Sequence, residues 1–155
     1  MPTSNFRRID LDLLYPPFLE KILNVVAACN ERGFPYHATR GCDTYGAQMA
    51  LWAKGRTMRG PKVTNAKGGQ SAHNFGLAVD FVLDSNKEIP GIQPDWSAEA
   101  YRVLIEESRK IGLHSGMSYN DYPHIGWNGY VSGEDMVPLH LAWEKSADSG
   151  PSTLA

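Results

Sequence analysis

The sequence predicts a single α+β domain in which helices flank a small antiparallel sheet. The chain has 155 residues, of which 42% are hydrophobic, so it can bury one core of ordinary size. Helical and strand-like segments occur without the regular β–α–β alternation that builds a parallel sheet. No internal repeat and no linker divides the chain. We therefore expect one domain over residues 1–145, followed by a flexible polar tail over residues 146–155.

The first predicted helix covers residues 17–31, and Gly33 ends it. The second starts near Asp43 or Thr44, either of which suits an N-cap, and ends at Gly55. Apolar residues repeat at helical spacing in both segments. They are Phe18, Ile22, Val25 or Val26, and Cys29 in the first helix, and Tyr45, Met49 and Trp52 in the second.

Two further helices are expected in the second half of the chain. The third begins near Ser97, and the fourth is short, with Pro138 in its first turn. Their apolar residues are Tyr101, Leu104, Ile105 and Ile111 in the third, and Leu139, Leu141 and Trp143 in the fourth.

Three segments have the character of strands, namely residues 36–39, 77–83 and 123–127. The middle one is the clearest, because its large apolar residues occupy every second position. These residues are Leu77, Val79, Phe81 and Leu83. Apolar residues in the segment 56–74 follow neither the helical nor the strand spacing. A loop of this length in a small domain is usually functional or disordered.

Charge and cysteine content exclude several classes of protein. Fifteen Lys and Arg against seventeen Asp and Glu give a net charge of −2, which predicts neither nucleic-acid binding nor stable membrane association. Cys29 and Cys42 are too few for a disulfide framework, so we expect two partly buried free thiols. The N-terminus has no apolar signal core, and no apolar run reaches the roughly 20 residues that span a bilayer. We therefore expect synthesis in the cytoplasm without a signal peptide.

Asp80 is the first residue that indicates chemistry. It lies inside the most apolar predicted strand, on the same face as Ala78 and Val82. A carboxylate in such a strand costs free energy unless something pairs with it. A buried salt bridge, a capping role for the carboxylate, or a bound metal cation would each compensate this cost.

His73 and His124 favour the metal. Each histidine alone is compatible with ordinary packing. Together with Asp80, two imidazoles and one carboxylate form a three-ligand set that leaves a zinc ion one open position. A water bound there has a pKa of about 7 and can attack an amide.

Asp121, three residues before His124, is the candidate base for that water. Residues three apart face opposite sides of a flat strand, so this role requires a bend in the chain. Pro123 lacks a backbone donor and disfavours a regular strand at this point. Trp127 either walls the site or packs. The other histidines are expected to have only surface or local packing roles: His37, His114 and His140.

These residues form the motifs of a known family. Ser71-x-His73-x6-Asp80 and Asp121-x-x-His124 resemble the S-x-H-x6-D and [DE]-x-x-H motifs of bacterial and phage zinc peptidases. That family comprises D-alanyl-D-alanine carboxypeptidases, D,D-dipeptidases and L-alanyl-D-glutamate endopeptidases. The resemblance implies that His73, Asp80 and His124 bind one zinc ion and that Asp121 is the catalytic base. It also implies a Hedgehog/D,D-peptidase-like fold.

The resemblance covers residues 10–130 and is most specific over residues 45–81. Residues 48–57, QMALWAKGRT, are similar to the family's Q-x-x-L-Y-x-x-G-R-T segment, and residues 60–81 are similar to the L-alanyl-D-glutamate endopeptidase branch.

One departure concerns an arginine that, in the family, contacts the substrate and the developing oxyanion. Its position falls on Asp43 in this chain. Arg40 is the candidate to supply the missing charge. Arg56 is either a second substrate contact or a solvated surface charge. Ser71 either donates a hydrogen bond in the site or stabilises its loop.

The resemblance implies a zinc-dependent peptidoglycan endopeptidase that hydrolyses the L-Ala–D-Glu bond of the stem peptide, as single-domain phage endolysins do during host lysis. Such an enzyme acts as a monomer in the periplasm or cell wall and reaches it through a holin-like partner. Three alternatives stay open. They are a D,D-carboxypeptidase acting on peptidoglycan precursors, an inactive zinc-containing wall-binding module, and a virion-associated peptidase used for entry.

Overall fold

An antiparallel five-stranded sheet forms the centre of the protein. The structure, a computed structural model, describes residues 11–42, 45–64 and 72–127. Four strands lie in the order β1-β2-β5-β4, and β3 pairs with the far end of β2. The strands are β1 (Tyr36–Arg40), β2 (Ala78–Asp84), β3 (Pro94–Asp95), β4 (His114–Gly116) and β5 (Asp121–Gly126). The predicted α+β class with a small antiparallel sheet is therefore confirmed.

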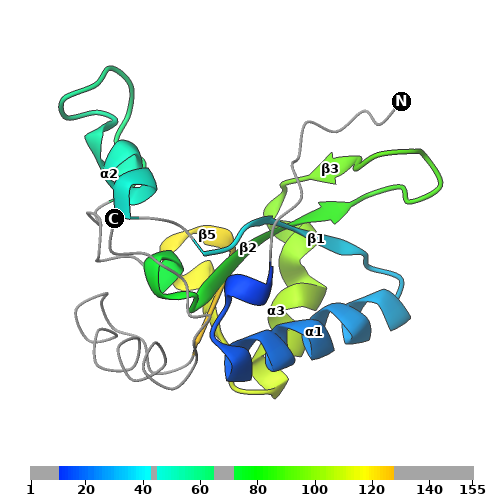
Figure 1. Ribbon diagram of the computed structural model, residues 1–155. Helices are drawn as coiled ribbons and strands as arrows, with labels where there is room; N and C mark the ends of the chain where they lie inside the picture. Colours follow the sequence, from blue (N-terminus) through cyan, green and yellow to red (C-terminus); the bar gives the residue numbers. More distant parts are fainter. Residues whose placement is uncertain (1–10, 43–44, 65–71, 128–155) are drawn as a thin grey trace.

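The helices are α1 (Pro16–Glu31), α2 (Tyr45–Ala53) and α3 (Arg102–Lys110), together with the short 3₁₀ helices η1 (Leu11–Leu13), η2 (Ala72–Phe75), η3 (Ala98–Tyr101) and η4 (Met117–Tyr119). Figure 1 shows α1 and α3 side by side against one face of the sheet, whereas α2 stands away from this layer. The main core lies between these two helices and the strands. The first predicted helix is confirmed, and its expected apolar residues Phe18, Ile22, Val25 and Cys29 are buried.

Buried tyrosines join the helical layer to the sheet. The Tyr101 hydroxyl donates a hydrogen bond of 2.9 Å to the carbonyl oxygen of Phe81 in β2. The Tyr36 hydroxyl of β1 donates to the carbonyl oxygen of Ala100 and accepts from the backbone N–H of Leu104. Because these polar atoms are satisfied inside the core, the sheet is held in one position against α3.

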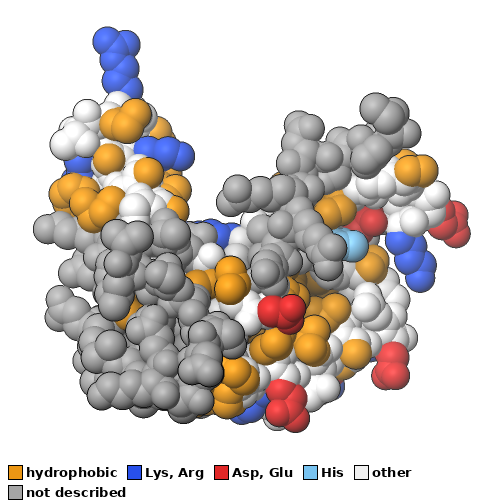
Figure 2. Space-filling model, viewed as in Figure 1, with side chains coloured by type: hydrophobic (Ala, Val, Ile, Leu, Met, Phe, Trp, Pro, Cys, Tyr) orange, Lys and Arg blue, Asp and Glu red, His pale blue; other side chains and the backbone are white. Residues whose placement is uncertain are grey.

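The second predicted helix is confirmed as α2. Of the apolar residues that repeat along it, Met49 is 42% exposed. Among the α2 side chains that the structure describes, the buried one is that of Gln48. We call residues 45–64 the α2 arm. Figure 2 shows exposed apolar side chains gathered on this arm. Met58 and Val63 of the arm are exposed.

The strands also differ in part from their predictions. The segments predicted at residues 36–39 and 77–83 are β1 and β2, shifted by one residue at most at each end. β3 and β4 were missed because two or three residues show no alternation. Pro123, expected to disfavour a strand, lies inside β5. The end of the predicted loop 56–74 forms the 3₁₀ helix η2, which contains His73.

Several predictions lie outside the described residues. They concern the N-cap at Asp43 or Thr44, the role of Ser71, the fourth helix at Pro138, His140 and the polar tail. Within the described ranges, no helix has the length and apolar character needed to cross a membrane.

Candidate metal centre

The pairing of β2 with β5 places an aspartate beside a histidine. Asp80 and His124 are direct partners in this antiparallel pair, so both side chains lie on the same face of the sheet. η2 ends just before β2 and brings His73 to the same place. We call His73, Asp80 and His124 the His–Asp cluster. One nitrogen or oxygen atom from each of the three lies within 4.8 Å of the other two.

The distances in the His–Asp cluster suit a zinc ion. Asp80 Oδ1 lies 3.3 Å from His73 Nε2 and 3.5 Å from His124 Nδ1. Zinc-to-ligand bonds of about 2.0–2.2 Å in tetrahedral geometry place neighbouring donor atoms roughly 3.3 Å apart. Asp80 Oδ1 is buried and makes no hydrogen bond with the part of the chain that the structure describes. A cation between the three atoms would satisfy this oxygen.

A backbone carbonyl orients the ring of His73. His73 Nδ1 lies 2.9 Å from the carbonyl oxygen of Gly41, which follows β1. A carbonyl oxygen only accepts hydrogen bonds, so Nδ1 carries the proton and donates it. The lone pair of the neutral ring is then on Nε2, the atom that faces Asp80. This arrangement is typical of histidines that ligate metals, whose other nitrogen binds a second group.

The electrostatics of Asp80 favour the carboxylate form. Burial acts to raise the pKa of Asp80, but the positive charge that the His73 and His124 rings carry when protonated outweighs burial and holds this pKa well below its usual range. A metal cation held between the neutral rings would favour the carboxylate in the same direction. Asp80 is therefore charged at neutral pH, as a metal ligand must be.

Asp121 reaches the His–Asp cluster because β5 bends. Ser115 of β4 pairs with Ile125 of β5, whereas the next residue of β4, Gly116, pairs with Asp121. The intervening part of β5 arches out of the regular pairing, and Asp121 Oδ2 comes within 3.9 Å of His124 Nδ1. The chain thus contains the bend that the role of a base requires.

Gly116 makes this bend possible. A Cβ atom built on Gly116 would overlap the carbonyl oxygen of Asp121 and lie 3.0 Å from the Cβ atom of His124. Only glycine fits where β4 and β5 approach this closely. Gly116 was not predicted from the sequence, because its close contacts lie across the sheet.

Asp121 has the electrostatics of a proton acceptor. Burial, together with the negative charge of Asp80, raises the pKa of Asp121 above its ordinary value. The side chain is nevertheless 48% exposed, so water reaches it. A carboxylate with a raised pKa is a better base, and this matches the requirement of proton transfer near neutral pH.

His114 lies closer to the His–Asp cluster than its expected packing role suggested. Its ring stacks on Tyr119 and lies edge-on to His124, with ring centroids 6.4 Å apart. His114 Nε2 is 3.2 Å from the Tyr119 hydroxyl. This local packing extends to the His124 ring. His37, by contrast, is exposed on β1.

Arg40 also reaches the cluster, through an irregularity in β1. Ala38 pairs with Phe81, but the next pair joins Arg40 to Asp80, so Thr39 is an extra residue. This β-bulge puts Arg40 directly opposite Asp80. Arg40 Nη1 lies 3.9 Å from Asp80 Oδ2. The positive charge missing at position 43 is thus present beside the proposed metal ligand.

Arg56 and Trp127 make their contacts elsewhere. The Arg56 guanidinium lies over the ring of Trp52 and donates hydrogen bonds to the carbonyl oxygens of Trp52 and Thr64, all within the α2 arm. Trp127 packs edge-on against Tyr15 and Phe18 in the core.

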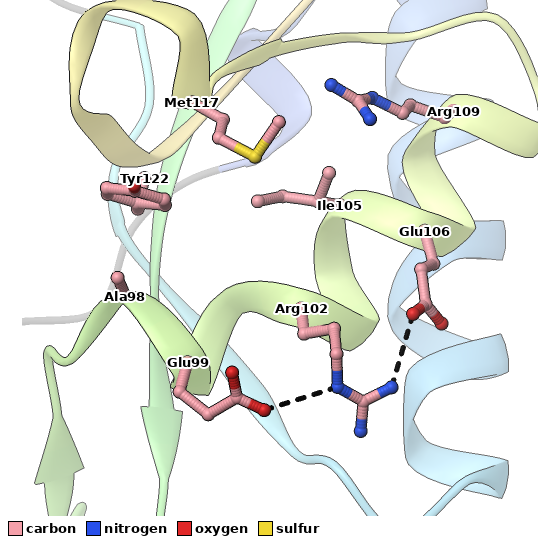
Figure 3. Close-up of a pocket in the computed structure, with 8 residues that line it drawn as sticks. All are labelled: Ala98, Glu99, Arg102, Ile105, Glu106, Arg109, Met117 and Tyr122. Atoms are coloured by element: carbon pink, nitrogen blue, oxygen red, sulfur yellow. Dashed lines mark hydrogen bonds and ion pairs between the residues drawn. The ribbon is translucent and has the colours of Figure 1, made fainter.

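A separate pocket of about 380 Å³ lies between η3 and α3 on one side and Met117 of η4 and Tyr122 of β5 on the other. Figure 3 shows Arg102 paired with Glu99 and Glu106 along its edge, with Ile105 further in. Tyr122 lines this pocket, whereas its neighbour Asp121 lies at the His–Asp cluster. No residue of the cluster lines the pocket.

The fold and the cluster together define a class of protein. A small α+β domain gathers two histidines and an aspartate on an antiparallel sheet, with a second acid beside them, which is a donor set suited to a metallopeptidase. The chain belongs to the VanY family, described as D-alanyl-D-alanine carboxypeptidase, whose model matches residues 12–126. This is a family of peptidases that act on peptidoglycan, and the suspected resemblance is confirmed.

A curated relative is the peptidoglycan L-alanyl-D-glutamate endopeptidase CwlK of Bacillus subtilis (strain 168). The alignment is 125 residues long with 31% identity, and the match covers 72% of this chain and 72% of the relative.

Solved structures share the fold. The L-Ala D-Glu endopeptidase ChiX of Serratia marcescens is 17% identical with a TM-score of 0.52, over 83% of this chain and 90% of ChiX. A variant of the vancomycin resistance D,D-pentapeptidase VanY from a VanB-type cassette, in complex with Zn(II), is 21% identical with a TM-score of 0.54, over 94% and 86%. VanYB in complex with D-alanine-D-alanine is 20% identical with a TM-score of 0.54, over 97% and 88%.

Proposed function

We propose that this protein is a zinc-dependent peptidoglycan endopeptidase that hydrolyses the L-Ala–D-Glu bond of the stem peptide. The observation that carries the proposal is the convergence of the His–Asp cluster with Asp121 beside it. The identity to CwlK, whose name states this bond, supports the choice of substrate.

His73, Asp80 and His124 would hold one zinc ion through Nε2, Oδ1 and Nδ1. Zinc bound there supplies Lewis acidity to the peptide carbonyl and acidifies water. His73 keeps its ligating lone pair in place through the hydrogen bond to Gly41, and Asp80 supplies the negative charge.

Asp121 performs the proton transfers. Its carboxylate accepts a proton from the attacking water and then gives it to the leaving amine of D-Glu. Arg40 stands on the other side of Asp80 and binds negative charge on the substrate. A contact of Arg56 with substrate, and a hydrogen bond from Ser71, remain predictions.

The second candidate function is a D,D-carboxypeptidase that removes terminal D-Ala. The description of the matching family and the likeness to VanYB bound to D-alanine-D-alanine favour it. Both candidates use the same cluster and the same base, and they differ only in the bond that is cut.

Digestion of purified peptidoglycan by the zinc-loaded protein tests the proposal. We expect new amino groups on Glu and little released D-Ala. Asp121→Asn should lower kcat by roughly 10²–10⁴-fold while zinc stays bound. Glu88→Gln, an exposed acid in the β2–β3 connection, is the matched control and should act like wild type.

Other products would give other conclusions. Free D-Ala as the main product would support the carboxypeptidase instead. A zinc-loaded protein that binds peptidoglycan but releases neither product would be the inactive wall-binding module.

We further propose that the protein is a phage endolysin that acts as a monomer and reaches the wall through a holin-like partner. Expression together with a membrane-permeabilising protein should lyse a Gram-negative host, and expression alone should not. Detection of the protein inside phage particles would favour a role in entry.

A further inference from the structure

Gln48 is a buried polar residue that the proposed reaction does not use. Its side chain is 1% exposed, although the neighbouring residues Ala47 and Met49 of α2 are exposed. α2 otherwise stands apart from the sheet (Figure 1). A buried amide requires partners for its oxygen and its nitrogen, so its contacts show what it holds in place.

Both ends of the Gln48 amide make hydrogen bonds. Oε1 accepts a hydrogen bond of 2.7 Å from Arg40 Nη2. Nε2 donates one of 3.4 Å to the Thr64 hydroxyl at the end of the α2 arm. A guanidinium only donates, so Arg40 fixes which end of the amide faces it. Gln48 therefore connects the α2 arm to the guanidinium of Arg40, which lies beside the His–Asp cluster.

The contact with Gln48 is the more directional of the two described here for Arg40. Arg40 Nη1 lies 3.9 Å from Asp80 Oδ2, which is the distance of an ion pair and longer than a hydrogen bond. An ion pair at this distance does not by itself set the orientation of a long, flexible side chain. The short hydrogen bond to a buried amide restricts the plane of the guanidinium.

We propose that Gln48 is a positioning residue that orients Arg40 to bind the free α-carboxylate of the residue that follows the scissile bond. This inference rests on the proposed function. D-Glu linked through its side chain and a terminal D-Ala both carry such a carboxylate next to the scissile amide. A planar guanidinium binds a carboxylate through paired hydrogen bonds, which requires a fixed orientation.

The test compares two stem peptides, one with a free α-carboxylate and one in which it is an amide. Wild type should prefer the free acid by roughly 10- to 100-fold in kcat/KM, the range of a hydrogen-bonded charge. Arg40→Ala and Gln48→Ala should each remove most of this preference, chiefly through KM. The double variant should be no worse than Arg40→Ala, because the two residues act as one unit.

Two further variants sharpen the test. Thr64→Val removes only the outer hydrogen bond and should reduce the preference less than Gln48→Ala does. Gln93→Ala is the matched control. The Gln93 side-chain amide donates to the carbonyl oxygen of Pro90 within the β2–β3 connection, which is not part of the α2 arm, so this variant should keep the full preference.

A readout without substrate separates this inference from the proposed function. The side-chain NMR signals of Arg40 should show slow rotation in wild type and fast rotation in Gln48→Ala. If wild type cleaves neither peptide but shows this change, the positioning role stands and the proposed function fails. The positioning role is overturned if Gln48→Ala keeps slow rotation, or if it lowers cleavage of both peptides equally and additively with Arg40→Ala.

Discussion

Gly116 lies directly opposite Asp121 where β4 and β5 meet, so close that no side chain fits between them. This contact belongs to the backbone, yet it determines where the proposed base stands relative to His124. A substitution at Gly116 should therefore act on the metal centre as well as on the sheet.

Gly116→Ala should move Asp121 and His124 away from Asp80. The added methyl group meets backbone and Cβ atoms that cannot move independently, so we expect a loss of about 1–3 kcal/mol in stability and a clear loss of zinc affinity. Gly33→Ala is the control. Gly33 has a φ of +84° and open space around its Cβ position, so this change strains only the backbone. Equal zinc affinity in both variants would contradict the prediction.

Two aspartates in β2 should differ in their effect on metal binding. Asp80→Asn removes a proposed ligand, and we expect zinc affinity to fall by more than about 100-fold, the upper range for a supporting residue. Asp84→Asn is the matched control, because Asp84 Oδ1 accepts hydrogen bonds from the backbone N–H groups of Asn86 and Gln93. It should cost about 1 kcal/mol in stability and leave zinc affinity unchanged. Titration calorimetry measures zinc affinity in both variants, and the reverse order would exclude Asp80 as a ligand.

Removal of the metal should lower both activity and thermal stability. Metal bound only to the folded state, at a free concentration of about 100 times Kd, adds about 2.7 kcal/mol. At about 2–4 °C per kcal/mol for a chain of this size, a chelator should lower Tm by about 5–11 °C. Asp80→Asn should show no such shift in the same scan. An unchanged Tm and lytic rate in metal-free wild type would refute the zinc proposal.

Stability should fall at alkaline pH because of Cys29. Burial raises the pKa of this thiol from 9.0 to about 12 in the folded protein. Between these values the unfolded chain loses the proton and the folded chain keeps it, so the free energy of unfolding falls as pH rises. The slope is at most about 1.4 kcal/mol per pH unit for one group. Denaturant unfolding at about pH 8 and about pH 10 should show a smaller fall for Cys29→Ala, and identical falls would contradict the assignment.

The sequence predicted those parts of the fold that depend on local pattern. α1 and β2 follow directly from the spacing of their apolar residues. Asp80 in so apolar a strand indicated a compensating partner, and its combination with His73 and His124 favoured a metal. The approach of Asp121 to His124 was a requirement of the proposed chemistry that the sequence could not establish. It depends on the pairing of β5 with Gly116 in another strand.

The position of Arg40 was likewise not readable from sequence. A side chain in a five-residue strand can face either side, and the extra residue Thr39 decides which. The helix α2 was predicted, but the exposure of Met49 on it was not, because the pattern of a helix does not tell whether another layer covers it. The buried residue of α2, Gln48, is polar, so the spacing of apolar residues gives no sign of it.

Two of the three proposed zinc ligands are direct partners in a pair of strands, and the third lies in the 3₁₀ helix just before β2. The spacing of Asp80 and His124 is therefore set by the hydrogen bonds of the sheet, and the ring of His73 is oriented by the carbonyl oxygen of Gly41 just after β1. Lengthening the β2–β3 connection, or exchanging the outer part of the α2 arm, would leave the donor atoms where they are. Such a scaffold can acquire a new substrate preference through its periphery while its reactive centre stays the same.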